Sequence, residues 1–125
     1  MAMKTVLAIG IDPAFVDLSR FPGLTSDLMR NYFDGELQRL GENGYEVVPC
    51  LIDLGTTAEQ VTAAALASRR FDCVMIGAGL RQPPEHLLLF EKILNLVHHR
   101  APTACICFNS NPADTIDAVR RWIKA

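Results

Sequence analysis

The sequence lacks the features that mark several classes of protein. No apolar run approaches the roughly 18 residues that a membrane-spanning helix needs, so we expect no membrane segment. There is no excess of positive charge, because 12 Lys and Arg residues stand against 14 Asp and Glu, a net charge of -2. We therefore expect no binding to nucleic acid or to an anionic membrane surface, since both use clustered basic residues.

The spacing of the four cysteines fits no common cysteine site. A zinc site pairs its ligands across short loops, and a thioredoxin-like site needs C-x-x-C. Cys50, Cys73, Cys105 and Cys107 lie instead inside apolar runs that are typical of strands. We predict four reduced thiols that act as small core residues, a cytoplasmic location, no metal ion and no cofactor.

Several phosphate-binding and catalytic motifs are also missing. The chain has no Walker loop and no G-x-G-x-x-G after its first apolar run. Asp12-Pro-Ala-Phe15 stands where flavodoxins have a Gly- and Ser/Thr-rich phosphate loop, and the D-x-H-x-x-G motif of cobalamin-binding domains is absent. A small tyrosine phosphatase needs Cys and Arg together in one loop, whereas Cys73 lies within a predicted strand, away from Arg81. The motifs therefore assign no catalytic residue.

Short apolar runs alternate four times with longer helical patterns. We predict strands over 5–11, 45–52, 71–77 and 103–108, and helices over about 26–40, 58–69, 84–99 and 112–124. This alternation is typical of a parallel sheet with helices on both faces. The first run lacks polar alternation, which predicts burial on both faces. Pro49 cannot donate a ladder hydrogen bond, so the second strand is expected at an edge.

These elements predict one α/β domain over residues 1–125. With right-handed crossovers and an edge second strand, the expected order is 2-1-3-4 in a four-stranded parallel sheet. The fold class is a three-layer doubly wound, flavodoxin-like domain. Thr57-Ala-Glu-Gln60 predicts a capping box before the second helix, and Trp122 is expected to pack the last helix on the sheet.

Ligands of such sheets bind at the carboxyl ends of the strands, where the strand order reverses. Here that place lies between the first and third strands, and the predicted ligand-binding residues are Asp12, Phe15, Asp53, Gly77, Gly79, Arg81, Asn109 and Ser110. Segment 12–24 has no clear periodicity, and long loops of this kind often cover binding sites, with Phe15 and Phe21 as candidate covers.

Each polar candidate also has a purely structural explanation. Asp12 is placed to act as a base, bind a cation or orient a hydroxyl, and Asp53 to partner it, but both also suit turns. The Gly77-Ala-Gly79 amides, with Arg81, suit an anion, but the glycines also suit a sharp exit from the sheet. Asn109 and Ser110 supply an amide and a hydroxyl, or belong to a helix cap.

The third strand resembles a strand of bacterial response-regulator receiver domains. Phe71-Asp72-Cys-Val-Met-Ile-Gly77 is similar to their aromatic-Asp-apolar-Val-apolar-apolar-Asp phosphoacceptor pattern. Ile11-Asp12-Pro13 and Arg100-Ala-Pro102 are similar to the corresponding parts of receivers. Gly77 stands where the phosphorylated Asp would be, Asp12 alone represents the acidic cluster, and a fifth strand has no counterpart.

The resemblance implies a receiver-like regulatory or protein-interaction domain that is neither phosphorylated nor catalytic. Its partner, if it is another protein, is not identified by the sequence. The alternative is a small enzyme or small-molecule-binding protein that uses the crevice beside the first and third strands, with an unknown substrate.

A homodimer is predicted from unpaired apolar surface. Apolar residues cover well over half of the circumference of helix 84–99, more than a helix packed on a sheet needs. Strand 103–108 is expected at an edge, and it contains no Pro or charge to discourage pairing. The dimer contact is predicted at Leu88 and Leu89 or at that strand edge. The alternative is that the last helix and segment 12–24 cover this surface within one chain.

Overall fold

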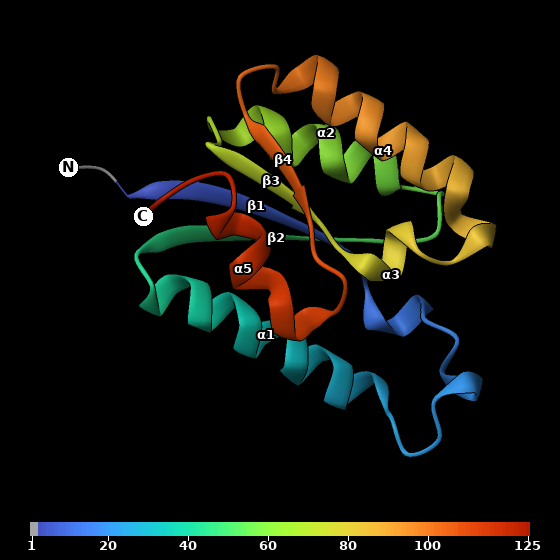
Figure 1. The fold of residues 1–125 in the computed structure, drawn as a ribbon. Coiled ribbons are helices and arrows are strands. Elements are labelled where there is room, and N and C mark those ends of the chain that lie inside the picture. Colours follow the sequence, from blue (N-terminus) through green and yellow to red (C-terminus); the bar gives the residue numbers. More distant parts are fainter. Residues whose placement is uncertain (1–2) are drawn as a thin grey trace.

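The computed structural model describes residues 3–125 and contains the predicted parallel sheet (Figure 1). Its strands are β1 (Lys4–Ile11), β2 (Tyr45–Ile52), β3 (Cys73–Ile76) and β4 (Cys105–Phe108). Neighbouring strands are parallel, and their order is β2-β1-β3-β4, which confirms the predicted fold class and topology. β1 pairs with β2 from Lys4 opposite Tyr45 to Ile11 opposite Ile52, whereas β3 pairs with each neighbour through four residues.

Helices form a layer on each side of the sheet. Figure 1 shows α1 (Ser26–Glu42) and α5 (Thr115–Arg120) below the sheet, and α2 (Ala58–Ser68) and α4 (Leu87–Arg100) above it. The short α3 (Ala78–Arg81) directly follows β3, and 3-10 turns span Pro13–Phe15, Leu18–Arg20, Pro84–His86 and Pro112–Asp114. Within residues 3–125, no helix has the length and apolar character needed to cross a membrane.

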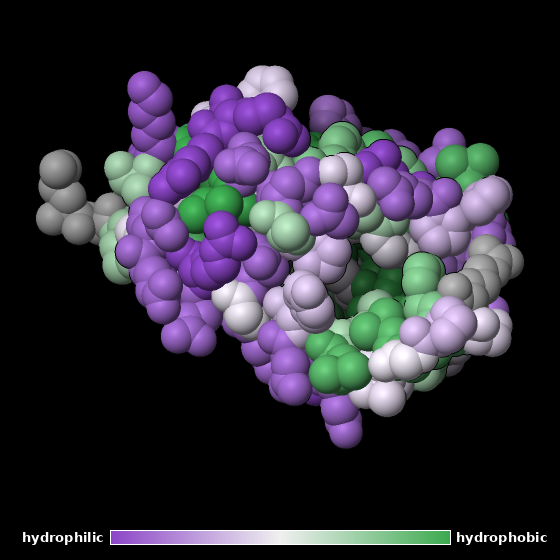
Figure 2. Space-filling view, turned by 60° about the horizontal axis from the view of Figure 1, so that its bottom comes forward, coloured by the Kyte–Doolittle hydropathy of each residue, from purple (hydrophilic) through white to green (hydrophobic). Residues whose placement is uncertain are grey.

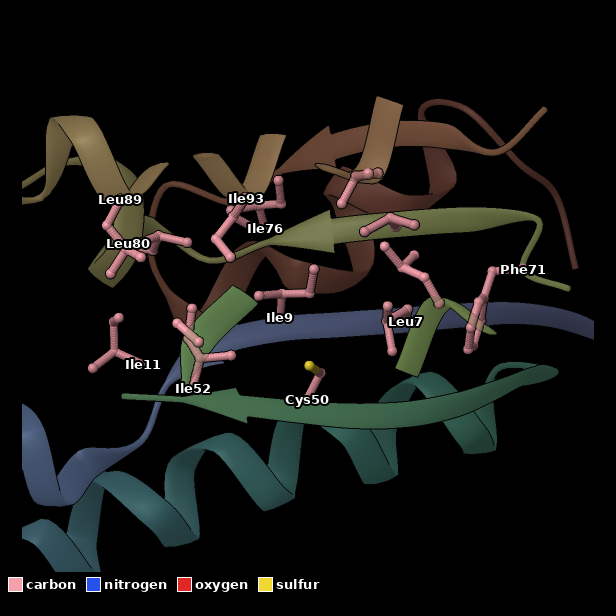
Figure 3. Packing of buried hydrophobic residues seen from close by; sticks show 14 residues of the cluster. Leu7, Ile9, Ile11, Cys50, Ile52, Phe71, Ile76, Leu80, Leu89 and Ile93 are labelled. Atoms are coloured by element: carbon pink, nitrogen blue, oxygen red, sulfur yellow. The ribbon is translucent and has the colours of Figure 1, made fainter. Parts of the chain in front are cut away.

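The central strand β1 is buried on both faces, as its continuous apolar sequence predicts. Leu7, Ile9 and Ile11 face the core beneath α2 and α4, where Figure 3 shows Leu7 near Phe71 and Ile9 near Ile76 and Ile93. Val6 and Ala8 face the second core, together with residues of α1 and α5. Because both cores share β1, the two helical layers are joined through one strand.

The cysteines lie inside strands, as predicted. All four are free, and the Cys73 and Cys107 Sγ atoms approach to 3.5 Å between β3 and β4. The contact with Cys107, together with burial, raises the pKa of the Cys73 thiol above its usual range. Burial likewise raises the pKa of Cys50. Because the thiolate is the reactive form, these two residues have the properties of structural thiols.

The region after β3 differs from its predicted structure. The sequence predicts a loop over residues 77–84, between the third strand and the third helix, but residues 78–81 of it form α3, whose Leu80 is fully buried. The next helix begins at Leu87 rather than at residue 84. Pro83 is extended, with ψ of 125°, as is usual for a residue that precedes a proline, and this separates α3 from the turn that leads into α4.

Two further local predictions are wrong. The Thr57 side chain does not cap α2; its hydroxyl donates to Asp53 Oδ2 at 2.7 Å instead. Trp122 does not pack on the sheet, because α5 ends at Arg120 and the Trp122 side chain is 60% exposed. Both errors concern short helix ends, where tertiary contacts decide the local conformation.

Candidate functional site

Two adjoining cavities lie at the carboxyl ends of β1 and β3, where the strand order reverses. The inner cavity, about 120 Å³, lies beside the face of α1 that packs on the sheet. The outer cavity, about 390 Å³, lies between segment 12–24 and the turn before α4. Val16, Met29, Ala78 and Gly79 line both, so the two cavities form one crevice. Figure 2 shows a hollow with hydrophobic residues on its floor. This is the position at which doubly wound sheets bind ligands.

The inner cavity has a mainly apolar wall. Its larger apolar side chains include Ile9 and Ile11 of β1, Met29, Phe33 and Leu37 of α1, and Met75 of β3. The polar side chains of this wall are Glu36, Asn109 and Thr115. Apolar walls with a few placed polar groups are typical of small-molecule sites.

Asn109 joins the turns that follow β3 and β4. Its Oδ1 accepts from the amide of Ala78 at 2.7 Å, and its Nδ2 donates to Thr115 Oγ1 at 2.9 Å. Its carbonyl oxygen accepts from Arg81 Nη2 at 3.0 Å. Asn109 lines the inner cavity, while most of its polar atoms are engaged within the fold. The following helix cap is formed by Asn111.

The predicted anion site is not assembled in this conformation. The Ala78 amide is bonded to Asn109, and the Arg81 guanidinium lies 5.5 Å from the centre of the Phe108 ring. Gly77 and Gly79 line the inner cavity, and Gly79 also lines the outer one. Arg81 lines neither cavity. Ser110 also lies outside both, and its hydroxyl is bonded to the Asp114 carboxylate.

Asp12 and Asp53 both stabilise turns rather than lining a cavity. The Asp12 carboxylate accepts from the amide of Ala14 at 3.0 Å and from Arg30 Nη2 at 2.9 Å. The bond from Ala14, aided by that from Arg30, keeps the pKa of Asp12 below its ordinary value despite some burial. The Asp53 carboxylate accepts from the amides of Gly55 and Thr57, which lowers its pKa as well. These bonds are those of turn-stabilising aspartates, the alternative role that the sequence offers for both residues.

Segment 12–24 forms the outer wall of the crevice. It consists of two 3-10 turns, which Asp12 and Asp17 begin with bonds to the amides of Ala14 and Ser19. Phe15 and Phe21, both about half exposed, line the outer cavity together with His86. The His86 Nδ1 atom lies 3.2 Å from the carbonyl oxygen of Gly79.

Glu36 is a lining residue that is missing from the predicted site. It is 8% exposed, and both of its carboxylate oxygens contact Arg39 Nη1, at 3.1 and 3.3 Å. The sequence contains one indication that Glu36 faces the fold. It lies three residues after Phe33 and four before Leu40, on the apolar stripe of α1. A charged residue within such a stripe departs from the usual pattern, in which the buried face of a helix is apolar and the exposed face is polar.

Sequence comparison adds no family to these observations. No protein-family model matches the chain, and no curated protein shows significant sequence similarity to it. We therefore assign function from the residues of the crevice.

Replacing Asn109 should separate the two turns that it joins. Asn109→Ala leaves the Ala78 amide and the Thr115 hydroxyl without this partner, so we expect the free energy of unfolding to fall by about 1–3 kcal/mol. Asn95→Ala, which removes an exposed side chain bonded only to its own helix, should change it by less than about 0.5 kcal/mol. Urea unfolding measures both, and equal effects would contradict a joining role for Asn109.

Proposed function

We propose that this chain is a small-molecule-binding domain whose ligand occupies the crevice between β1 and β3. The observation that carries the proposal is the pair of adjoining cavities at the point where the strand order reverses. The outer cavity alone, about 390 Å³, lies within the range of roughly 300–1,000 Å³ that is usual for ligand pockets. Apolar side chains from α1, β1 and β3 supply the surface that such a ligand would bury.

The lining residues support binding more directly than catalysis. Among the described side chains, neither cavity is lined by Ser, Cys or Lys, and the Thr115 hydroxyl of the inner cavity is bonded to Asn109 and to the Pro112 carbonyl rather than to a base. The histidine of the outer cavity, His86, contacts a backbone carbonyl rather than a group that it could activate. Nucleophilic catalysis needs a nucleophile and a base within hydrogen-bond reach of each other, and this crevice does not supply that pair.

Adding a side chain at Gly79 should block the crevice. Gly79 lines both cavities, and a Cβ atom built on it meets no atom within 4 Å. We expect Gly79→Leu to fold and to lose binding of compact apolar probes such as benzyl alcohol, measured by NMR titration of the labelled chain. Gly35→Leu is the matched control, because Gly35 also has open space but lines neither cavity. An unaltered chain that binds no such probe, or equal binding by both variants, would refute the proposal.

A second candidate function is that of a receiver-like interaction domain. It is supported by Gly77, which follows β3 directly and donates its amide to the carbonyl of Ile9 on β1. In the resemblance to receivers, this is the position of the phosphorylated Asp, and glycine offers no side chain to phosphorylate.

Acetyl phosphate distinguishes such a domain from a working receiver. We expect no increase in mass after incubation of the chain with acetyl phosphate and magnesium, because Gly77 replaces the acceptor. A conventional receiver domain treated in parallel shows that the reagent is active. An acid-labile phosphoryl adduct on this chain would contradict the candidate function.

We further propose that the chain forms a homodimer and that it works in a reducing compartment, the cytoplasm. The four free thiols support the choice of compartment. The predicted pair of contact residues needs a correction, since Leu89 is 9% exposed and belongs to the core. Leu87 and Leu88, 58% and 64% exposed at the start of α4, are the better candidates. α2 packs beside α4, which covers part of the apolar surface that favours a dimer. The other candidate contact, β4, is an edge strand in the observed order.

Replacing the exposed leucines by charged residues tests the dimer. We expect light scattering to give about twice the mass of one chain, and Leu87→Glu with Leu88→Glu to reduce it to one chain, because two charges cannot be buried cheaply in an apolar contact. Leu28→Glu, an exposed leucine on the opposite layer, is the control. A single-chain mass for the unaltered protein would refute the dimer, and a dimer that survives the double change would move the contact to β4.

A further inference from the structure

α1 carries a carboxylate on the side that it packs against the rest of the fold. Glu36 lies one helical turn after Phe33, and both side chains line the inner cavity with Met29. The residue is 8% exposed. Removing a carboxylate from water is costly unless hydrogen bonds or opposite charge compensate it. The fold places this group at an apolar cavity, where a ligand can supply part of that compensation.

Arg39 does not use the full bonding capacity of Glu36. A single nitrogen, Arg39 Nη1, contacts both carboxylate oxygens, and the Arg39 side chain is itself 50% exposed. An ionised carboxylate has about four acceptor positions, so one shared donor leaves acceptor positions for a ligand. The other polar side chains of the inner cavity, Asn109 and Thr115, are bonded to each other and to the backbone. Glu36 is therefore the polar side chain best placed to orient a ligand.

The charge around the crevice has mainly one sign. Of the described side chains that line it, Glu36, Asp17 and Glu85 are acidic, His86 is the one basic side chain, and none is Lys or Arg. Of the neighbouring arginines, Arg30 forms an ion pair with Asp12, and Arg39 partly neutralises Glu36 while leaving acceptor positions on its carboxylate. A cleft lined by acidic groups attracts cations and repels anions.

We infer that the ligand of the crevice is an organic amine, with a compact apolar body and an ammonium group that donates to Glu36. This inference rests on the proposed binding function and specifies its ligand. Met29, Phe33 and Met75 supply an apolar wall for the body of the ligand. The ammonium group supplies the donors and the positive charge that the acidic lining favours.

Three probes of nearly equal size test this assignment. Benzylamine, benzyl alcohol and benzoate share one ring and differ in the charge of the attached group. We would titrate each into the labelled full chain near neutral pH at low salt and follow the amide signals of Met29 and Gly79. We expect benzylamine to bind at least about tenfold more tightly than benzyl alcohol, and benzoate to bind most weakly.

Glu36→Gln supplies the site-specific test, because it keeps the shape of the side chain and removes its charge. It should weaken benzylamine binding by about tenfold and leave benzyl alcohol binding unchanged. Glu42→Gln is the control, since it removes one charge from an exposed position near the end of the same helix. It should leave the preference for benzylamine intact.

The outcomes separate the identity of the ligand from binding itself. Equal binding of amine and alcohol, tightest binding of benzoate, or a preference for amine that survives Glu36→Gln would overturn the inference and leave the binding function standing. Absence of binding by all three probes would overturn both. If Glu36→Gln fails to fold, the ranking of the three probes on the unaltered chain decides the inference.

Discussion

The crevice depends on the hydrogen bonds made by one buried amide, that of Asn109. Its side chain accepts from Ala78 after β3 and donates to Thr115 at the start of α5, while its carbonyl accepts from Arg81. β3 and β4 are each only four residues long, so their ladder alone does little to fix the turns at their carboxyl ends. Because Asn109 connects the exits of both strands, the inner wall of the crevice keeps one shape. Satisfied polar groups within a buried region specify its geometry in this way, since any other arrangement leaves donors without acceptors.

Two glycines line the inner cavity at closely packed positions, Gly10 in β1 and Gly77 directly after β3. A Cβ on Gly10 would lie 3.5 Å from the Phe33 ring, and one on Gly77 would lie 3.4 Å from the carbonyl oxygen of Ile9. A larger side chain at either position would extend into this closely packed region beside the cavity. On the side of the sheet that α2 and α4 cover, large apolar side chains fill the core, as Figure 3 shows. Both glycines lie where the order of the sheet reverses and separates the crossover helices, so a close approach of the chain and the inner cavity occur side by side.

The sequence predicts the sheet better than the site. β1 is recognisable from its unbroken apolar run, and Pro49 identifies β2 as an edge strand, because both signals are local. The sequence does not reveal that Arg81 donates to the carbonyl of Asn109, because this bond joins residues that lie 28 apart in the chain. The sequence places Asp12 correctly at the end of β1, but the direction of its carboxylate depends on Arg30 of α1. Glu36 leaves a trace as a charge within an apolar stripe, whose meaning becomes clear only when the cavity beside it is seen.

The two walls of the crevice are held by different kinds of bond, and this has a kinetic consequence. The described backbone hydrogen bonds that residues 13–24 donate all end within segment 12–24, whereas the amide of Asp12 is bonded to Ile52 of the sheet. Opening of the segment beyond Asp12 would therefore break no hydrogen bond of the sheet ladder, although it would break the bond from Ser26 Oγ to the Pro13 carbonyl and separate Val16 from the core. Loop motions of this kind take place within nanoseconds to microseconds, whereas opening of a packed core is far slower. A ligand held beneath Phe15 and Phe21 would thus be released when these local contacts open, without unfolding of the sheet.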